Sequence, residues 1–200
     1  MQKDYFRHKA GDYDQSECWV NNVDRIADAI QSRVRFLPGM HILDFGSGTG
    51  LLLQRVAPLV ERITAVDISP SMNAQLESKR GQLPCELDIR EMDLTRETLD
   101  QRFDGIISSM TLHHIEDIPG LLARFHGLLN PGGFIALADL DSEDGSFHEE
   151  DTGVFHFGFD RGWLEDTARQ AGFDCVGMVT ASAISKPDRE YPVFLLTATA

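Results

Sequence analysis

Basic residues are scarce in this chain, and their scarcity limits the partners that it can have. The 200 residues include 18 Lys and Arg against 32 Asp and Glu, which gives a formal net charge of −14. A nucleic-acid-binding protein needs a basic surface that displaces counterions from phosphates. In addition, no apolar run approaches the roughly 18 residues that a membrane-spanning helix requires. We therefore expect neither nucleic acid nor a membrane as a partner.

Cysteines are also few, and they form no recognisable pair. Cys18, Cys85 and Cys175 are widely spaced, and the chain contains no C-x-x-C motif. This pattern favours reduced thiols. The polar residues 1–14 lack the apolar segment of a secretory signal peptide. Together these two absences predict a cytoplasmic protein.

The hydrophobic content of 42% is sufficient for the core of one α/β domain and leaves little for a second. Trp19, Val23, Ile26 and Ile30 recur at three- and four-residue steps, which predicts a helix that ends before Pro38. We interpret residues 1–38 as an amino-terminal helical segment and residues 39–200 as one folded domain.

Apolar strands and helices alternate after residue 38. This alternation is typical of an α/β fold in which helices cover both faces of a doubly wound parallel sheet. The expected strands are residues 40–45, 62–67, 84–89, 103–109, 133–140, 173–181 and 192–199. The expected helices are residues 50–60, 70–80, 117–129 and 161–171. Because no helix separates the last two strands, we expect them to form a hairpin with the last strand antiparallel.

The most informative segment is HILDFGSGTG at residues 41–50. A buried strand ends near Asp44, and three glycines follow at alternate positions before the next helix. Glycines in such a loop allow positive φ and leave no side chain between the backbone and a ligand. In a doubly wound sheet, the loop after the first strand is where adenine nucleotides bind. A dinucleotide fingerprint would place its third glycine at position 51, which is occupied by Leu51.

The pattern acid-x-G-x-G-x-G in this loop resembles that of class I S-adenosylmethionine (SAM) methyltransferases of the small-molecule type. Four later segments are similar to motifs of the same family: ITAVDISPSM, Met92-Asp93-Leu94, FDGIISSMTLHHI and LLNPGGFIALADL. The resemblance implies SAM as cofactor, and a seven-stranded sheet in the order 3-2-1-4-5-7-6 with strand 7 reversed. It also implies a small-molecule acceptor, and we expect a monomer or homodimer.

The resemblance also implies which residues contact the cofactor. Asp67 would accept hydrogen bonds from both ribose hydroxyls, because a carboxylate offers two oxygens to a vicinal diol. Asp93 would receive the adenine amino group, with Asp88 as an alternative for the same role. The full set of expected cofactor contacts is Tyr13, Asp44, Gly46, Ser47, Gly48, Asp67, Ile68, Met72, Met92, Asp93, Leu94, Ser109 and Met110.

The cofactor motifs do not contain a base that could deprotonate the acceptor. The candidates for this base therefore lie in the loops that follow strands. Histidine is the natural candidate near neutral pH. His113 and His114 follow the fourth strand, while His148 and His156 flank an acidic segment after the fifth. The tentative catalytic residues are His148, His156 and His113. We expect no metal, since Ser108-Ser109-Met110 stands where metal-dependent catechol O-methyltransferases place an acid.

Two segments are candidates for a lid over the bound ligands. The loop SFHEEDTGVFHFGFD at residues 146–160 places aromatic residues inside an acidic connection, and Tyr13-Asp14 matches a short family element that lies over the cofactor. Two other functions stay open at this point. One is a SAM-binding protein without transferase activity, and the other is a nicotinamide-dependent oxidoreductase, which Leu51 and the reversed last strand disfavour.

Overall fold

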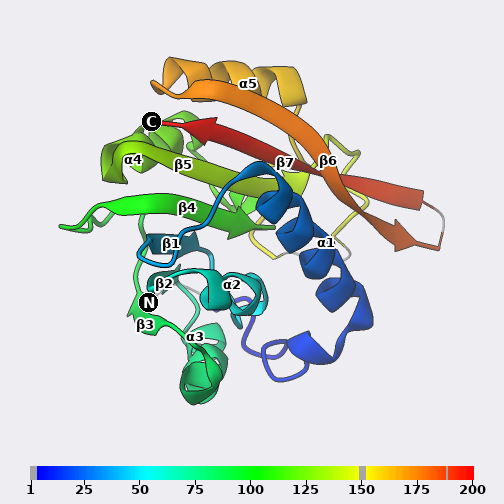
Figure 1. The fold of residues 1–200 in the computed structure, drawn as a ribbon. Helices are drawn as coiled ribbons and strands as arrows, with labels where there is room; N and C mark the ends of the chain where they lie inside the picture. The colour runs from blue at the N-terminus through cyan, green and yellow to red at the C-terminus, as the bar shows by residue number, and fades with distance from the viewer. Residues whose placement is uncertain (1–3, 149–151, 188) are drawn as a thin grey trace.

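The computed structural model describes residues 4–148, 152–187 and 189–200, and its centre is a seven-stranded sheet (Figure 1). The strand order is β3-β2-β1-β4-β5-β7-β6. β7 runs antiparallel to both of its neighbours, and the other neighbouring pairs are parallel. The expected α/β class, strand order and reversed last strand are therefore confirmed.

The strands are β1 (His41–Phe45), β2 (Arg62–Asp67), β3 (Glu86–Glu91), β4 (Phe103–Ser109), β5 (Leu129–Leu140), β6 (Asp174–Lys186) and β7 (Arg189–Thr199). The α-helices are α1 (Glu17–Arg33), α2 (Leu51–Val56), α3 (Pro70–Lys79), α4 (Ile118–Leu128) and α5 (Arg161–Gln170). Short 3-10 turns are η1 (Tyr13–Gln15), η2 (Ala57–Leu59), η3 (Arg80–Gln82) and η4 (Leu112–His114).

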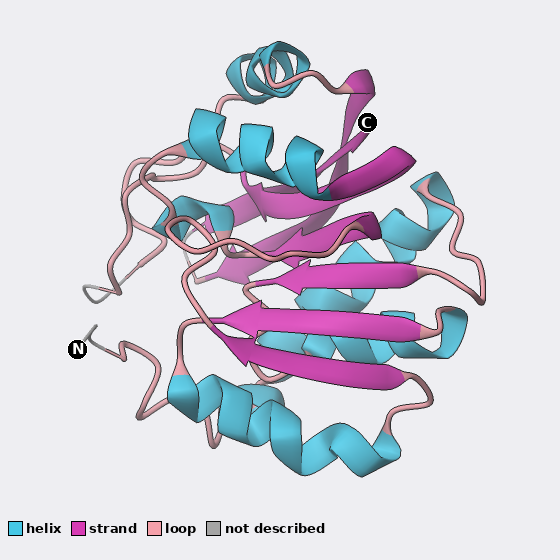
Figure 2. Ribbon diagram, turned by 90° about the vertical axis from the view of Figure 1, so that its left-hand side faces the viewer, coloured by secondary structure: helices cyan, strands magenta, loops and turns pink. Residues whose placement is uncertain are grey.

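Helices cover both faces of the sheet (Figure 2). Successive strand residues point to opposite faces, so the central strand β1 contributes to two cores. Ile42 packs in the core with residues of α1 and α2, whereas Leu43 packs in the core with residues of α4 and α5. Both side chains are fully buried. Burial on both faces explains why the parallel strands read as continuous apolar runs rather than as an alternating pattern.

Side-chain caps fix the start of two of the expected helices. The Met72 backbone N–H donates to Ser69 Oγ at 3.2 Å, with Pro70 in the first position of α3. The Trp163 N–H donates to Asp160 Oδ1 at 2.8 Å at the start of α5. A side-chain oxygen at the N-cap satisfies one of the free N–H groups of the first turn, so both helices begin where expected.

Four strands differ from their predicted bounds by two or more residues. β3 covers residues 86–91 rather than 84–89. β5 begins at Leu129, because Leu129 pairs with Phe103 and the Gly132 N–H donates to the Ala200 carbonyl. The β6–β7 hairpin is longer than expected and reaches Lys186 and Arg189, since the ladder between these strands continues to its turn. In each case, pairing with another strand decides the boundary.

The parallel strands end at one edge of the sheet, and the amino-terminal segment lies at that edge (Figure 2). All three cysteines are free thiols. Among the described residues, no helix has the length and apolar character that crossing a bilayer would take.

Candidate active site

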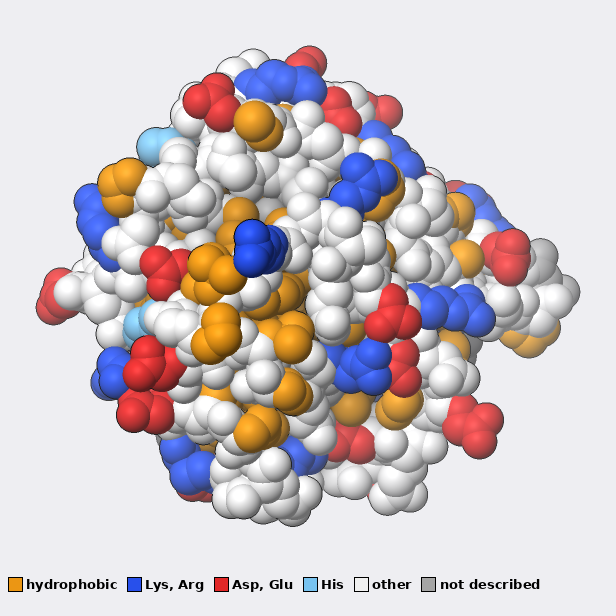
Figure 3. Space-filling view, in the orientation of Figure 1, with side chains coloured by type: hydrophobic (Ala, Val, Ile, Leu, Met, Phe, Trp, Pro, Cys, Tyr) orange, Lys and Arg blue, Asp and Glu red, His pale blue; other side chains and the backbone are white. Residues whose placement is uncertain are grey.

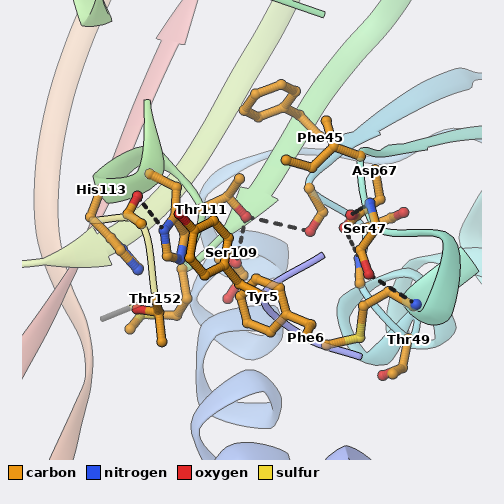
Figure 4. A pocket seen from close by; sticks show the side chains of 18 of the residues that line it. Tyr5, Phe6, Phe45, Ser47, Thr49, Asp67, Ser109, Thr111, His113 and Thr152 are labelled. Carbon is orange, nitrogen blue, oxygen red and sulfur yellow. Dashed lines mark hydrogen bonds between the residues drawn. The ribbon is translucent and has the colours of Figure 1, made fainter. Parts of the chain in front are cut away.

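A cavity of about 1020 Å³ lies at the edge where β1, β2 and β4 end. Ligand pockets in proteins commonly measure about 300–1,000 Å³, so this one has room for two small molecules. Its walls come from the glycine loop after β1, the ends of β2, β3 and β4, the amino-terminal segment, and the loop after β5. In Figure 4, Asp67 and Ser47 lie on one side of the cavity and His113 and Thr152 on the other, with Tyr5 and Phe6 between them.

The glycine loop forms one wall of the cavity. Gly46 and Gly48 have φ of 68° and 54°, in the left-handed region where glycine is favoured. A Cβ atom at Gly46 would overlap the Thr111 side chain, so this glycine lets the loop pack against the end of β4. A Cβ at Gly48 would meet no protein atom within 4 Å. Gly48 therefore leaves open the space that a ligand would occupy.

Asp67, at the end of β2, holds the glycine loop in place. Its Oδ2 accepts a hydrogen bond from the Gly48 N–H at 2.8 Å, and its Oδ1 accepts one from the Ser69 N–H at 2.8 Å. Burial raises the pKa of the Asp67 carboxyl, and these backbone hydrogen bonds oppose that effect. Each carboxylate oxygen has a second lone pair, so Asp67 can still accept hydrogen bonds from a ligand.

Asp44 is a buried carboxyl group at the base of the cavity. Its side chain is 1% exposed, and Oδ2 has no hydrogen-bond partner among the described residues. Burial, with a smaller contribution from the charge of Asp67, raises the pKa of Asp44 to about 8. Ser47 Oγ and Ser109 Oγ are also buried without a partner in the described part of the chain. A cluster of unpaired polar atoms fits a polar, cationic ligand group, such as the ammonium of an amino acid.

Residues after β2 and β3 form the far end of the same wall. Met72, Met92, Asp93 and Leu94 all line the cavity. Asp93 Oδ1 accepts hydrogen bonds from Thr95 N at 3.0 Å and from Thr95 Oγ1 at 2.5 Å, which fixes the carboxylate. Asp88 does not line this cavity; it lies within β3, where its carboxylate pairs with Arg90 at 2.9 Å. The geometry thus separates the two acids that the sequence left as alternatives.

The amino-terminal segment packs against the glycine-loop wall of the cavity. Asp14 accepts a hydrogen bond from Thr49 Oγ1 at 2.5 Å and forms an ion pair with Lys79, whose Nζ also donates to the Thr49 carbonyl at 2.7 Å. The Tyr13 ring stacks on Trp19, with ring centroids 6.2 Å apart. These contacts attach η1 to both the glycine loop and α3.

The loop after β5 covers the other side. The Phe155 N–H donates to the His113 carbonyl at 2.9 Å, which ties the loop to η4. The ring of Phe6 lies edge-on to that of His114, with centroids 5.8 Å apart, so the amino-terminal segment reaches the same place. Residues 149–151 of the proposed lid lie outside the described residues. The described parts of the two expected lid segments both line the cavity.

Three of the four candidate histidines lie together at this side. The rings of His114 and His148 lie 4.2 and 5.0 Å from that of His113, centroid to centroid. Burial, together with the charge of His113, lowers the pKa of His114 and of His148 to about 4. His156 is placed differently. Its Nε2 lies 2.9 Å from the Ile115 carbonyl, and it is not a cavity residue.

All the expected cofactor contacts, from Tyr13 to Met110, line the cavity, as do His113 and His148. Sequence reasoning missed Thr111, which packs on Gly46, and Asp139, which contacts His113 behind the cavity. Asp139 falls within the expected strand 133–140 and has no expected role in the site from the sequence. Its position directly after the apolar run of the fifth strand could have indicated that it lies at the ligand-binding edge.

The chain is similar to known proteins both in sequence and in fold. Residues 43–137 match the family model described as "Methyltransferase domain". The chain is 30% identical over 168 residues to an uncharacterised methyltransferase of Schizosaccharomyces pombe, covering 76% of this chain and 58% of that protein. It is 29% identical over 122 residues to a ubiquinone biosynthesis O-methyltransferase of Xanthomonas campestris, covering 60% of this chain and 51% of the relative. The chain thus spans little more than half the length of these curated relatives.

A solved structure shares the fold. Phosphoethanolamine N-methyltransferase 2 of Haemonchus contortus, in complex with S-adenosyl-L-methionine, superposes with a TM-score of 0.75 at 17% sequence identity. The match covers 98% of this chain and 59% of that one.

Proposed function

This chain belongs to the class I S-adenosylmethionine-dependent methyltransferases, and from that premise we propose that it transfers the SAM methyl group to a small-molecule acceptor. The observation that carries the proposal is the division of the cavity. The glycine loop and Asp67 lie at one end, and a cluster of histidines lies at the other. One chamber can therefore hold a cofactor and an acceptor in contact.

Several observations support a small molecule as the acceptor. Residues of the amino-terminal segment and of the loop after β5 both line the cavity, and the ring of Phe6 contacts that of His114 there, which suits a small acceptor. On the face seen in Figure 3, Lys and Arg side chains are scattered among Asp and Glu rather than gathered in one basic patch. The name of the Xanthomonas relative places that enzyme in ubiquinone biosynthesis, and one structural neighbour was solved with phosphomonomethylethanolamine.

The buried polar atoms at the cofactor end fit SAM. We assign Asp44 to the ammonium of its methionine part, Asp67 to the ribose hydroxyls, Asp93 to the adenine amino group, and the side chains of Met72 and Met92 to the faces of the ring. When bound, SAM supplies an electrophilic methyl group on a positively charged sulfur. The task of the protein is to align this methyl group with the acceptor and to exclude water.

We assign removal of the acceptor's proton to the histidine cluster. His113 and His148 line the acceptor half of the cavity and are the candidate bases. His156 is not included, because it does not line the cavity and its Nε2 lies 2.9 Å from the Ile115 carbonyl.

A methyl-transfer screen tests the proposal. The purified chain is incubated with SAM carrying a tritiated methyl group and with a panel of metabolites grouped by acceptor atom, and labelled products are separated by size. The proposal predicts label in a compound of low molecular mass. Tight SAM binding with no transfer to any compound would instead identify a SAM-binding protein without transferase activity, and label in protein or nucleic acid would overturn the choice of acceptor.

SAM affinity is expected to rise with pH, because Asp44 must lose a proton to pair with an ammonium group. The carboxyl is protonated in the free protein below its pKa of about 8. Binding then releases one proton, so the association constant should increase by up to about tenfold per pH unit between pH 6 and 7.5. Calorimetry in buffers of different ionisation enthalpy measures both effects. Asp44→Asn should bind SAM with no such slope, and a flat profile for the wild-type chain would refute the assignment.

The covering segments are expected to open and close. Ligand entry requires the contacts of Asp14 and Phe6 to break, and closure would exclude water from the transfer. Hydrogen exchange should therefore slow in residues 4–15, 145–148 and 152–158 when S-adenosylhomocysteine is added. Backbone amides of α5, on the far side of the sheet, provide the reference. Equal protection of both segments with and without the ligand would rule out a lid.

A further inference from the structure

Asp139 is a fully buried carboxylate that the proposed function does not yet use. It lies at the end of β5 and is 0% exposed. Oδ1 lies 2.7 Å from His113 Nδ1 and accepts from the Leu140 N–H at 2.7 Å, while Oδ2 accepts from the His113 N–H at 3.1 Å. Asp139 therefore holds both the ring and the backbone of a cavity residue without touching the cavity itself.

The charge of Asp139 determines which nitrogen of His113 carries hydrogen. Burial by itself would raise the pKa of Asp139, but the charge of His113 and the hydrogen bonds to the carboxylate outweigh it and lower that pKa. An ionised carboxylate has no hydrogen to donate. The hydrogen in the 2.7 Å contact must therefore belong to His113 Nδ1. In the neutral ring, Nε2 is then the nitrogen with the free lone pair, and the ring geometry directs it away from Asp139.

Asp139 is the acid in contact with the histidine cluster. The charged and titratable groups around the cluster are Asp139 from β5, His114 from η4, His148 from the loop after β5, Lys9 from the amino-terminal segment and Lys186 from β6. Asp139 is the one acid that acts on both His114 and His148 in this set, where it opposes the lowering of their pKa. Asp139 is therefore placed to pair with positive charge on the ring that it contacts, that of His113.

We propose that Asp139 is a positioning residue that holds His113 with hydrogen on Nδ1, so that His113 Nε2 takes a proton from an O–H or N–H acceptor during methyl transfer. The inference rests on the proposed function and narrows the acceptor to compounds that lose a proton on methylation. As the bond from the acceptor atom to the methyl carbon forms, the methyl–sulfur bond breaks and its electron pair stays on sulfur. The acceptor's proton moves to Nε2, and the imidazolium remains paired with Asp139 until it releases the proton to water.

NMR of the histidine rings tests the positioning role without any acceptor. Long-range proton–nitrogen correlation spectra of the labelled wild-type chain at neutral pH should show His113 with hydrogen on Nδ1 and a bare Nε2. The amide of Asp139→Asn can donate to Nδ1, so this variant should move hydrogen to Nε2. His126, which packs on Phe173 at the other end of α4, serves as the unchanged reference in each spectrum. Hydrogen on Nε2 in the wild-type chain would overturn the proposal even if the variant did not fold.

Kinetics with the acceptor from the labelled screen tests the catalytic role. Asp139→Asn should lower kcat by about 10²–10⁴-fold, the range for general-base catalysis, and leave the KM for SAM within about threefold because the cofactor half is untouched. One proton should be released per methyl group transferred. A kcat within threefold of wild type, or a preferred acceptor that carries no hydrogen on the methylated atom, would contradict the proposal. Absence of transfer to any compound would defeat the proposed function, and the NMR result would still decide the role of Asp139.

Discussion

Gly48→Val is expected to abolish SAM binding while the fold persists. A Cβ at Gly48 points into space that holds no protein atom within 4 Å, and that space is part of the cavity. The valine methyl groups would therefore occupy the cofactor volume rather than collide with the core. Left-handed backbone in a non-glycine residue costs about 1–3 kcal/mol, which a domain of ordinary stability tolerates.

Gly132→Val is the matched control for this variant. Gly132 also has positive φ, at 78°, and a Cβ there also meets no atom within 4 Å, but it lies near the start of β5, outside the cavity. Both variants place valine in left-handed backbone, and only the Gly48 variant should lose the heat of SAM binding in calorimetry. If Gly48→Val binds SAM as the wild type does, the glycine loop is not the cofactor cradle.

Asp67→Ala is expected to weaken SAM binding by about 2–4 kcal/mol, roughly 30- to 1,000-fold. Two losses combine in this variant. The ribose hydroxyls lose their charged acceptor, and the Gly48 N–H loses the hydrogen bond that shapes the glycine loop. Calorimetric titration with SAM and with S-adenosylhomocysteine should give the same loss, because the two ligands share the ribose.

Asp88→Ala is the control for Asp67→Ala, because the Asp88 carboxylate does not line the cavity. Asp88 pairs with Arg90 on the partly exposed strand β3, so its removal should change SAM affinity less than threefold. A loss of similar size in the two variants would point to a general effect of charge. An unchanged affinity in Asp67→Ala would remove this residue from the cofactor site.

The sequence was sufficient for the fold because the signals that define it are local. Ser69-Pro70 begins α3, and the apolar runs of β1, β2 and β4 are buried on both faces of the sheet. The glycines of the loop after β1 likewise indicate positive φ from their identity alone. Strand ends were less predictable. The turn residues Asn130 to Gly133 indicate a break, yet pairing across to β4 and β7 draws them into β5.

The site was less predictable where it depends on long-range contacts. His148 and His156 occur in one loop with similar neighbours, and only the fold places the first in the cavity and the second against the Ile115 carbonyl. The pairing of His113 with Asp139 joins a residue of the short turn η4 to one at the end of β5. The attachment of Asp14 to Thr49 and Lys79 brings together three separate segments. None of these contacts leaves a pattern within a short stretch of sequence.

The measurement that tests the central claim most directly is calorimetric titration of the wild-type chain with SAM and, separately, with NAD. The loop from Asp44 to Gly50 and the cavity beside Asp67 predict saturable micromolar binding of SAM and no appreciable binding of NAD. Binding of NAD more tightly than SAM would contradict the assignment of this cavity to a methyl donor.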